Sequence, residues 1–190
     1  MRDLKYCRCA VICHGLSERR IVSYIKSNLH LKLEIFSNNK GQSSIQITSV
    51  LNFIKQFKSL KTFADRCGIE YKNKKLVNFK LFIIMDTDDC TEKEKNSFLD
   101  KSMFKAHPLY DYIYPIYNSP KLENVLHKAK IMTTMIKDNI KGTYYFKAFP
   151  INKGILSMNS YNEIELFKKK LELVNSTNMD EFVEYCLSLV

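Results

Sequence analysis

Residues 81–89 read Leu-Phe-Ile-Ile-Met-Asp-Thr-Asp-Asp, an apolar run that ends abruptly on three carboxylates. An unbroken apolar run of this length is typical of a strand that is buried on both faces, as in the middle of a parallel sheet. In open sheets of this kind, ligands bind at the carboxyl ends of the strands. The run therefore predicts a central parallel strand with a ligand site at its end.

The three carboxylates predict a metal site there. On a continuing strand Asp86 and Asp88 would share one face, because residues two apart point the same way, while Asp89 would start the loop. Three neighbouring anions repel one another, and a divalent cation offsets that repulsion. Oxygen ligands favour Mg²⁺ or Mn²⁺ over Zn²⁺. The alternative is a loop in which Asp89 caps a helix that begins near Thr91, although a cap needs only one carboxylate.

Strand and helix patterns alternate along the first two thirds of the chain. Strands are expected at 6–13, 33–36, 81–86 and 112–117. Helices with apolar residues at helical spacing follow them, the first one capped by Ser17. Two more helices are expected at about 162–173 and 180–189. This pattern predicts an α/β fold, with a mostly parallel sheet of about four strands flanked by helices and a helical C-terminal tail.

Composition restricts the class of protein. At 190 residues, with 45% hydrophobic and 26% charged residues, the chain is expected to form a single domain over 1–190. Its six cysteines form no CxxC pair and no Cys/His zinc spacing, which is typical of a protein in a reducing cytoplasm. No secretory signal is visible and no segment approaches membrane-spanning length, so no membrane partner is expected.

The formal net charge of +10 predicts an anionic partner. Eight basic residues lie between Lys55 and Lys80, just before the acidic strand, against only two acidic ones. A solvated surface helix and loop would have the same composition. Beside a metal site, however, Lys72, Lys74 and Lys75 would attract the same phosphodiester as the metal. This combination predicts nucleic acid, either DNA or RNA, as the partner.

Acidic residues recur just past the ends of separate strands. Glu18 follows the first strand, Asp86 and Asp88 follow the third, and Glu123 follows the fourth. Carboxylates from separate strand ends can converge on one site, as two-metal phosphodiester chemistry requires. Metal ions there lower the pKa of a water molecule and hold the charge on the transferring phosphoryl group. Taken alone, Glu18 or Glu123 can equally be a partner of a helix dipole.

This order of motifs resembles the TOPRIM domain of topoisomerases, primases and nucleases, in particular the RloB-like and OLD-type nucleases of bacterial defence against phage. The family has an apolar strand, then Glu-Gly, often a second acid three residues past the Gly, and later Asp-x-Asp after the third strand. The matching stretches here are Cys13-His14-Gly15-Leu16-Ser17-Glu18 and Asp86-Thr87-Asp88. RloB-like members also have Asn-Pro-x-Phe-Glu, where this chain has Ser119-Pro120-Lys121-Leu122-Glu123. The resemblance covers about residues 6–128 and leaves 129–190 as a helical extension.

The resemblance implies a compact TOPRIM, Rossmann-like sheet and a nuclease that uses Mg²⁺ or Mn²⁺. Asp86 and Asp88 would bind the metal, and Glu18 would complete the metal shell or act as the acid/base. Three basic residues expected in or beside loops at the same edge of the sheet would hold phosphates: Arg19, Arg20 and Lys40.

One position departs from the family pattern, because His14 stands where the family has its first Glu. A histidine can serve as general acid or base, since its pKa lies near working pH. Alternatively, Glu18 supplies the missing carboxylate from one helical turn away. The third alternative is a degenerate site that binds metal or nucleic acid without cleaving it.

Three functions are therefore compared. The first is a metal-dependent nuclease of phage defence, which works as a homodimer or beside an ATPase or other defence subunit. The second is a catalytically degenerate binding or sensor subunit of a larger defence complex. The third is another Asp-x-Asp enzyme. A dehalogenase-type phosphatase needs its nucleophilic Asp on the first strand and a Thr or Val where this chain has Cys90, and a nucleotide-sugar transferase usually needs a longer chain.

Overall fold

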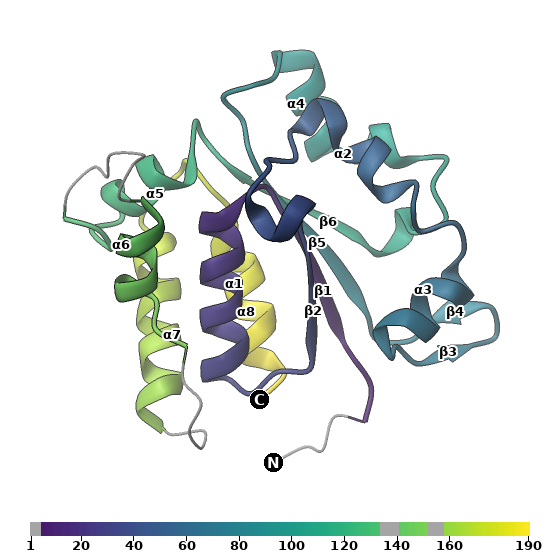
Figure 1. The fold of residues 1–190 in the computed structure, drawn as a ribbon, viewed down its shortest axis with the longest axis horizontal. Helices are drawn as coiled ribbons and strands as arrows, with labels where there is room; N and C mark the ends of the chain where they lie inside the picture. The colour runs from purple at the N-terminus through teal and green to yellow at the C-terminus, as the bar shows by residue number, and fades with distance from the viewer. Residues whose placement is uncertain (1–4, 134–140, 152–157) are drawn as a thin grey trace.

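Four parallel strands form the central sheet (Figure 1), in a computed structural model that describes residues 5–133, 141–151 and 158–190. The sheet order is β2-β1-β5-β6, and every neighbouring pair is parallel. The strands are β1 (Cys9–Cys13), β2 (Leu33–Phe36), β5 (Lys80–Asp86) and β6 (Ile113–Asn118). The predicted α/β class and parallel four-stranded sheet are confirmed, with β1 shorter than the predicted strand.

One face of the sheet is covered by the first helix and by the C-terminal helices. These are α1 (Leu16–Asn28), α5 (Leu122–Lys128), α6 (Lys141–Ala148), α7 (Met158–Leu171) and α8 (Met179–Ser188), which Figure 1 shows on one side of the strands. Cys9, Val11 and Cys13 of β1 point into this layer, where they are fully buried. Alternate residues of this strand point to opposite faces of the sheet, so the sheet separates two hydrophobic cores.

The other face of the sheet packs against α2 (Ile47–Ile54), α3 (Leu60–Cys67) and α4 (Glu92–Leu99). Ala10 and Ile12 of β1 point into this second core. A short antiparallel hairpin of β3 (Tyr71–Lys72) and β4 (Lys75–Leu76) precedes β5 and was not predicted. Three short 3₁₀ segments complete the described elements: η1 (Asn38–Gly41), η2 (Ser102–Phe104) and η3 (Tyr110–Tyr112).

The C-terminal helices are part of the main core. The Phe182 ring of α8 is fully buried, and its centroid lies 5.1 Å from that of Phe82 on β5. Near the other end of the sheet, Thr177 donates from its hydroxyl to Asn118 at the end of β6. The expected helices at 162–173 and 180–189 correspond to α7 and α8, and α8 seals one face of the sheet. In the described part of the chain, every helix is too short or too polar to traverse a bilayer.

The helix expected to begin near Thr91 does begin there, whereas the expected cap of the first helix differs from the structure. The first helix begins at Leu16 with Gly15 as its N-cap, so the prediction that Ser17 caps it is wrong. Before α4, the Thr91 hydroxyl accepts from the Glu94 backbone N–H, and the Glu94 carboxylate accepts from the Thr91 N–H at 2.8 Å. This reciprocal pair satisfies two orphan donors. The alternative that Asp89 serves as the cap is therefore wrong.

Thr91→Ala is expected to lower the free energy of unfolding by about 1 kcal/mol, because it removes the oxygen that accepts from the first turn of α4. Urea unfolding measures the change. Thr91→Ser is the matched control: it keeps the hydroxyl that accepts from the Glu94 N–H, so it should keep the contribution of the cap to the free energy of unfolding. Equal losses for Thr91→Ala and Thr91→Ser would contradict the capping assignment.

The topology brings the carboxyl ends of β1 and β5 together. The chain runs from β1 through α1 on one face to β2, and from β5 through α4 on the other face to β6. The two connections diverge between neighbouring strands, and crevices at such switch points bind ligands. Just beyond the last β1 residue, the His14 N–H donates to the Ile84 carbonyl at 2.9 Å.

Candidate functional site

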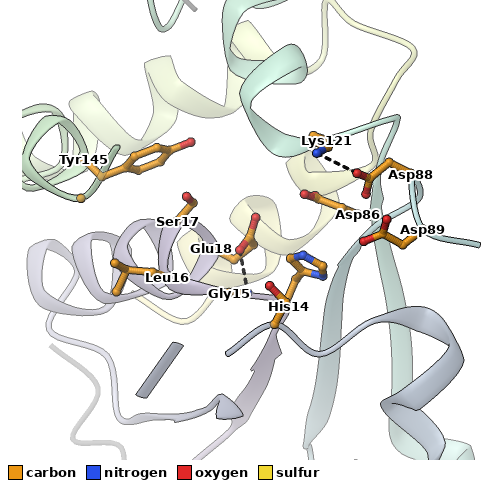
Figure 2. A pocket seen from close by; sticks show the side chains of 12 residues that line it. His14, Gly15, Leu16, Ser17, Glu18, Asp86, Asp88, Asp89, Lys121 and Tyr145 are labelled. Carbon is orange, nitrogen blue, oxygen red and sulfur yellow. Dashed lines mark hydrogen bonds and ion pairs between the residues drawn. The ribbon is translucent and has the colours of Figure 1, made fainter. Parts of the chain in front are cut away.

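A pocket of about 340 Å³ opens at this switch point (Figure 2). Its walls come from the turn after β1, the first turn of α1, the loop before α2, the end of β5 with the loop after it, the residue before α5, and two residues of α6. The lining residues are His14, Gly15, Leu16, Ser17, Glu18, Ser44, Asp86, Asp88, Asp89, Lys121, Gly142 and Tyr145. Five of the residues predicted from the strand ends, namely His14, Glu18, Asp86, Asp88 and Asp89, are thus brought together.

Asp86 is the last residue of β5 and is only 7% exposed. Its Oδ1 accepts hydrogen bonds from the Asn118 side-chain amide at 3.3 Å and from the Leu122 N–H at 3.1 Å. Burial, together with the charges of Glu18 and Glu123, raises the pKa of Asp86 from 3.8 to about 8. These carboxylates therefore repel one another across a poorly solvated pocket.

Glu18 is in the first turn of α1 and is 2% exposed. Its Oε2 accepts from the Gly15 N–H at 2.8 Å, which fixes the turn between β1 and α1. The same contact gives Glu18 a structural role as part of a helix cap. In Figure 2 its carboxylate lies in the pocket on the side of Asp86. The position one helical turn past His14 does place a carboxylate at the site.

Glu123 lies behind the pocket wall. It is 7% exposed, and its Oε1 accepts from the Ser17 hydroxyl and the Tyr145 hydroxyl, each at 3.1 Å. Ser17 and Tyr145 line the pocket themselves. Burial and the Glu123 charge raise the pKa of Tyr145 well above its usual range, so the hydroxyl stays protonated and donates a hydrogen bond to the Glu123 carboxylate. Glu123 thus acts on the site through its charge and through this network.

Asp88 and Asp89 line the pocket but are engaged by other side chains. Because β5 ends at Asp86, Asp88 lies in the following turn and does not share a strand face with Asp86. The Lys121 ammonium lies 2.9 Å from Asp88 Oδ2, and this hydrogen bond raises the pKa of Lys121. Gln46 donates to Asp89 Oδ2 at 2.9 Å.

His14 is fixed through its backbone, whose carbonyl accepts from the Ile45 N–H at 2.8 Å. Its Nδ1 is buried and has no hydrogen-bond partner in the described part of the chain. A buried polar atom without a partner costs free energy, so a ligand that pairs with it gains affinity. Electrostatic interaction with His14 opposes the rise in the pKa of Asp86, so the two side chains are close enough to interact.

The types of side chain that line the pocket suit a divalent cation, but their arrangement does not yet form a coordination site. Hard carboxylate oxygens suit Mg²⁺ or Mn²⁺. Burial raises the pKa of Asp86 most, and the negative charges of Glu18 and Glu123 raise it further. Among the described residues, however, no three Asp, Glu, His or Cys side chains are placed so that they could hold one ion together. Asp88 and Asp89 instead contact Lys121 and Gln46.

The predicted phosphate-binding residues of the first half, Arg19, Arg20 and Lys40, do not line the pocket. Arg19 donates to the Ser37 hydroxyl at 3.2 Å, beyond the end of β2. Arg20 lies 4.2 Å from the Phe146 ring centroid and donates to the Phe146 carbonyl, so it joins α1 to α6. Lys40 is exposed in η1, which follows β2. Arg19 and Lys40 therefore lie at the expected edge of the sheet, and Arg20 braces a helix pair.

The lysines of the hairpin lie at the other end of the sheet. Lys72, Lys74 and Lys75 are exposed on and between β3 and β4, which lead into the start of β5. The acidic pocket is at the far end of β5, whose 7 residues span roughly 20 Å at the usual rise of a strand. The structure does not bring these lysines to the pocket, so one phosphodiester group cannot contact both.

Seven of the twelve lining residues were not predicted as site residues, among them Lys121 and Tyr145. Lys121 stands inside the Ser-Pro-Lys-Leu-Glu stretch that located Glu123, and a cation two residues before an expected ligand was the available signal. Tyr145 comes from α6, far along the chain, and no motif marks it.

Comparison with known protein families, with curated proteins and with solved structures finds no match to this chain. The family resemblance therefore stays a prediction from the motifs.

Proposed function

We propose that this chain is a divalent-cation-dependent nuclease that cleaves phosphodiester bonds in DNA or RNA and acts in bacterial defence against phage. The observation that supports this most is the gathering of three buried carboxylates, Glu18, Asp86 and Glu123, from three separate strand-to-helix turns. Such a cluster is costly without a cation. A TOPRIM-like family, and an ATPase, another defence subunit or a second copy as partner, belong to the same proposal.

Asp86 and Glu18 would hold Mg²⁺ or Mn²⁺, joined by Asp88 when it exchanges Lys121 for the ion. The bound ion would supply an activated water and would stabilise charge on the phosphoryl group. Lys121, released from Asp88, would offer its ammonium to a phosphate oxygen. His14 would take a proton at its unpartnered Nδ1. Ser17 and Tyr145 would keep Glu123 oriented behind the site.

A catalytically degenerate nucleic-acid-binding or sensor subunit is the second candidate. Two observations favour it. His14 stands where the family has a Glu, and no three potential metal ligands of the described chain are arranged around one point. In this case Lys121 would remain paired with Asp88 in the working protein, and the pocket would bind nucleic acid without an ion.

The test is incubation of purified protein with mixed DNA and RNA pools in Mg²⁺, in Mn²⁺ and in EDTA. Cleavage that depends on the metal supports the first candidate. Binding without cleavage in every condition supports the second. Absence of both binding and cleavage overturns the two together. Calorimetry with Mn²⁺ on the same sample shows directly whether the pocket takes an ion.

Replacing Lys72, Lys74 and Lys75 by Gln is expected to flatten the salt dependence of duplex binding. Each lost phosphate contact lowers the slope of log affinity against log salt by about 0.9, so the triple variant should lose up to about 3. Lys72 and Lys75 are also a directly opposed pair in the hairpin, where like charges repel until an anion binds.

The charge-matched control for the hairpin variant replaces three consecutive lysines of α7 by Gln: Lys168, Lys169 and Lys170. Lys168 and Lys169 already pair with Glu172 and Glu165, so their loss should leave the slope nearly unchanged. Equal slopes for the wild type and the hairpin variant would identify the hairpin as a solvated face without contact to nucleic acid.

A further inference from the structure

A second cavity, of about 490 Å³, lies at the amino ends of β5 and β6, opposite the acidic pocket. Its walls include Arg8 before β1, Lys80 at the start of β5, Tyr114 on β6 and Tyr185 near the end of α8. None of these residues takes part in the proposed chemistry. The hairpin formed by β3 and β4 leads directly into this groove, since Asn78 and Phe79 also line it.

Lys80 lies between two tyrosine rings. Its Nζ is 4.3 Å from the ring centroid of Tyr114 and 4.6 Å from that of Tyr185. Residues 80 and 82 share a strand face, and Phe82 is paired in register with Tyr114, so the lysine and both rings meet on the α8 side of the sheet. Among the described residues, no carboxylate lies within ion-pair distance of Lys80.

The groove is held in shape by contacts beneath it. The Arg8 guanidinium donates to Glu70 at 3.2 Å and to the Val77 carbonyl at 3.0 Å. The Tyr185 hydroxyl donates to the Arg8 carbonyl at 3.0 Å. These bonds fix Arg8 and Tyr185 as walls, and Glu70 offsets the charge of Arg8 but not that of Lys80.

A second unassigned cation, Lys101, lies beside the Tyr114 wall of the groove. Lys101 lies 4.9 Å from the Tyr110 centroid and 5.8 Å from that of Tyr114. Tyr114 itself is 38% exposed although it is a large aromatic residue. Interleaved cations and accessible rings are the two features that bind single strands, because phosphates pair with the cations and bases stack on the rings.

We propose that this groove binds single-stranded nucleic acid, with a base against Tyr114 and phosphates near Lys80 and Lys101. The proposal rests on the proposed function only in its choice of nucleic acid as partner, and it does not depend on cleavage. An acidic peptide would use the lysines but gain little from the tyrosine ring. The groove would hold a flanking single strand roughly 20 Å from the acidic pocket.

The experiment measures fluorescence anisotropy of a labelled oligothymidylate of about 12 nucleotides in EDTA, so that no metal-dependent step contributes. Tyr114→Ala should weaken binding roughly 10- to 100-fold, as expected for the loss of one stacked base. Tyr114→Phe keeps the ring and should bind as the wild type does. Lys80→Gln should reduce the salt slope by about 0.7. Tyr161→Ala on α7 is the control for loss of an aromatic ring elsewhere and should bind normally.

The proposal that this groove binds single strands would be overturned if Tyr114→Ala and Lys80→Gln both bound with wild-type affinity and salt slope. Their melting temperatures should be unchanged in that comparison. Loss of oligothymidylate binding in Asp86→Asn together with full binding in the groove variants would also overturn the proposal, because that would place the strand in the acidic pocket. If polyglutamate displaced the oligothymidylate and Tyr114→Ala bound polyglutamate as the wild type does, the ligand of the groove would be an acidic peptide. That result would overturn the proposal of nucleic acid. Intact groove binding with no cleavage of any pool would instead reject the nuclease proposal alone.

Discussion

Asp86→Asn is expected to lower metal-dependent cleavage roughly 10²- to 10³-fold, the usual cost of removing one electrostatic group from an active site. The amide removes the charge that would attract the ion. It keeps a carbonyl oxygen that can accept from the Asn118 amide and the Leu122 N–H, as Asp86 Oδ1 does. The local fold should therefore survive. Cleavage is measured with the substrate identified from the mixed pools, and Mn²⁺ affinity by calorimetry.

The same variant should retain or slightly increase its affinity for nucleic acid, since one negative charge is lost from a protein that binds phosphates. Asp65→Asn, the same substitution at an exposed position of α3, is the matched control and should cleave normally. Equal Mn²⁺ affinity in the wild type and Asp86→Asn would reject the ion at Asp86. Equal cleavage would reject the assignment of this pocket as the active site.

The fold was predictable where the burial of an element determines the pattern of apolar residues in its own sequence. The run that ends at Asp86 is buried on both faces, so its composition alone identifies a central strand. The hairpin formed by β3 and β4 shows no such pattern, because each strand has only two residues and Asn73 and Lys74 adopt positive φ between them. The position of α8 was also hidden, since the contact of Phe182 with Phe82 joins segments far apart in sequence.

The site was predictable where chemistry follows strand ends. Glu18 and Asp86 come from turns that a parallel sheet must bring to one edge. Lys121, Gln46 and Tyr145 depend on how loops and helices pack around that edge, which no local pattern encodes. For the hairpin lysines the sequence-based prediction failed, because residues close in sequence to Asp86 were expected to lie close to it in space. Lys75 is near Asp86 in the chain, but a strand of seven residues separates the hairpin from the pocket.

The contribution of Asp86 to the stability of the metal-free protein should fall as pH rises from about 4 to about 8, and Asp86→Asn should lack this contribution. The folded-state pKa of Asp86 is about 8 against an ordinary 3.8, so between these values the folded chain binds a proton that the unfolded chain has released. The contribution of Asp86 is fully present below pH 3.8 and is lost as pH rises through about 8. Its slope reaches about 1.4 kcal/mol per pH unit.

The relative stability of Asp86→Asn, measured by urea unfolding in EDTA, should therefore increase by up to about 4 kcal/mol between pH of about 5 and about 8. Comparison with the variant at each pH cancels the titration of all other groups that it leaves unperturbed. Adding Mn²⁺ at the upper pH should restore the wild type and leave the variant unchanged, because an ion that binds only the folded state stabilises it. A stability difference that is independent of pH would show that Asp86 is not the group under electrostatic strain, and the ion would lose its physical reason for binding there.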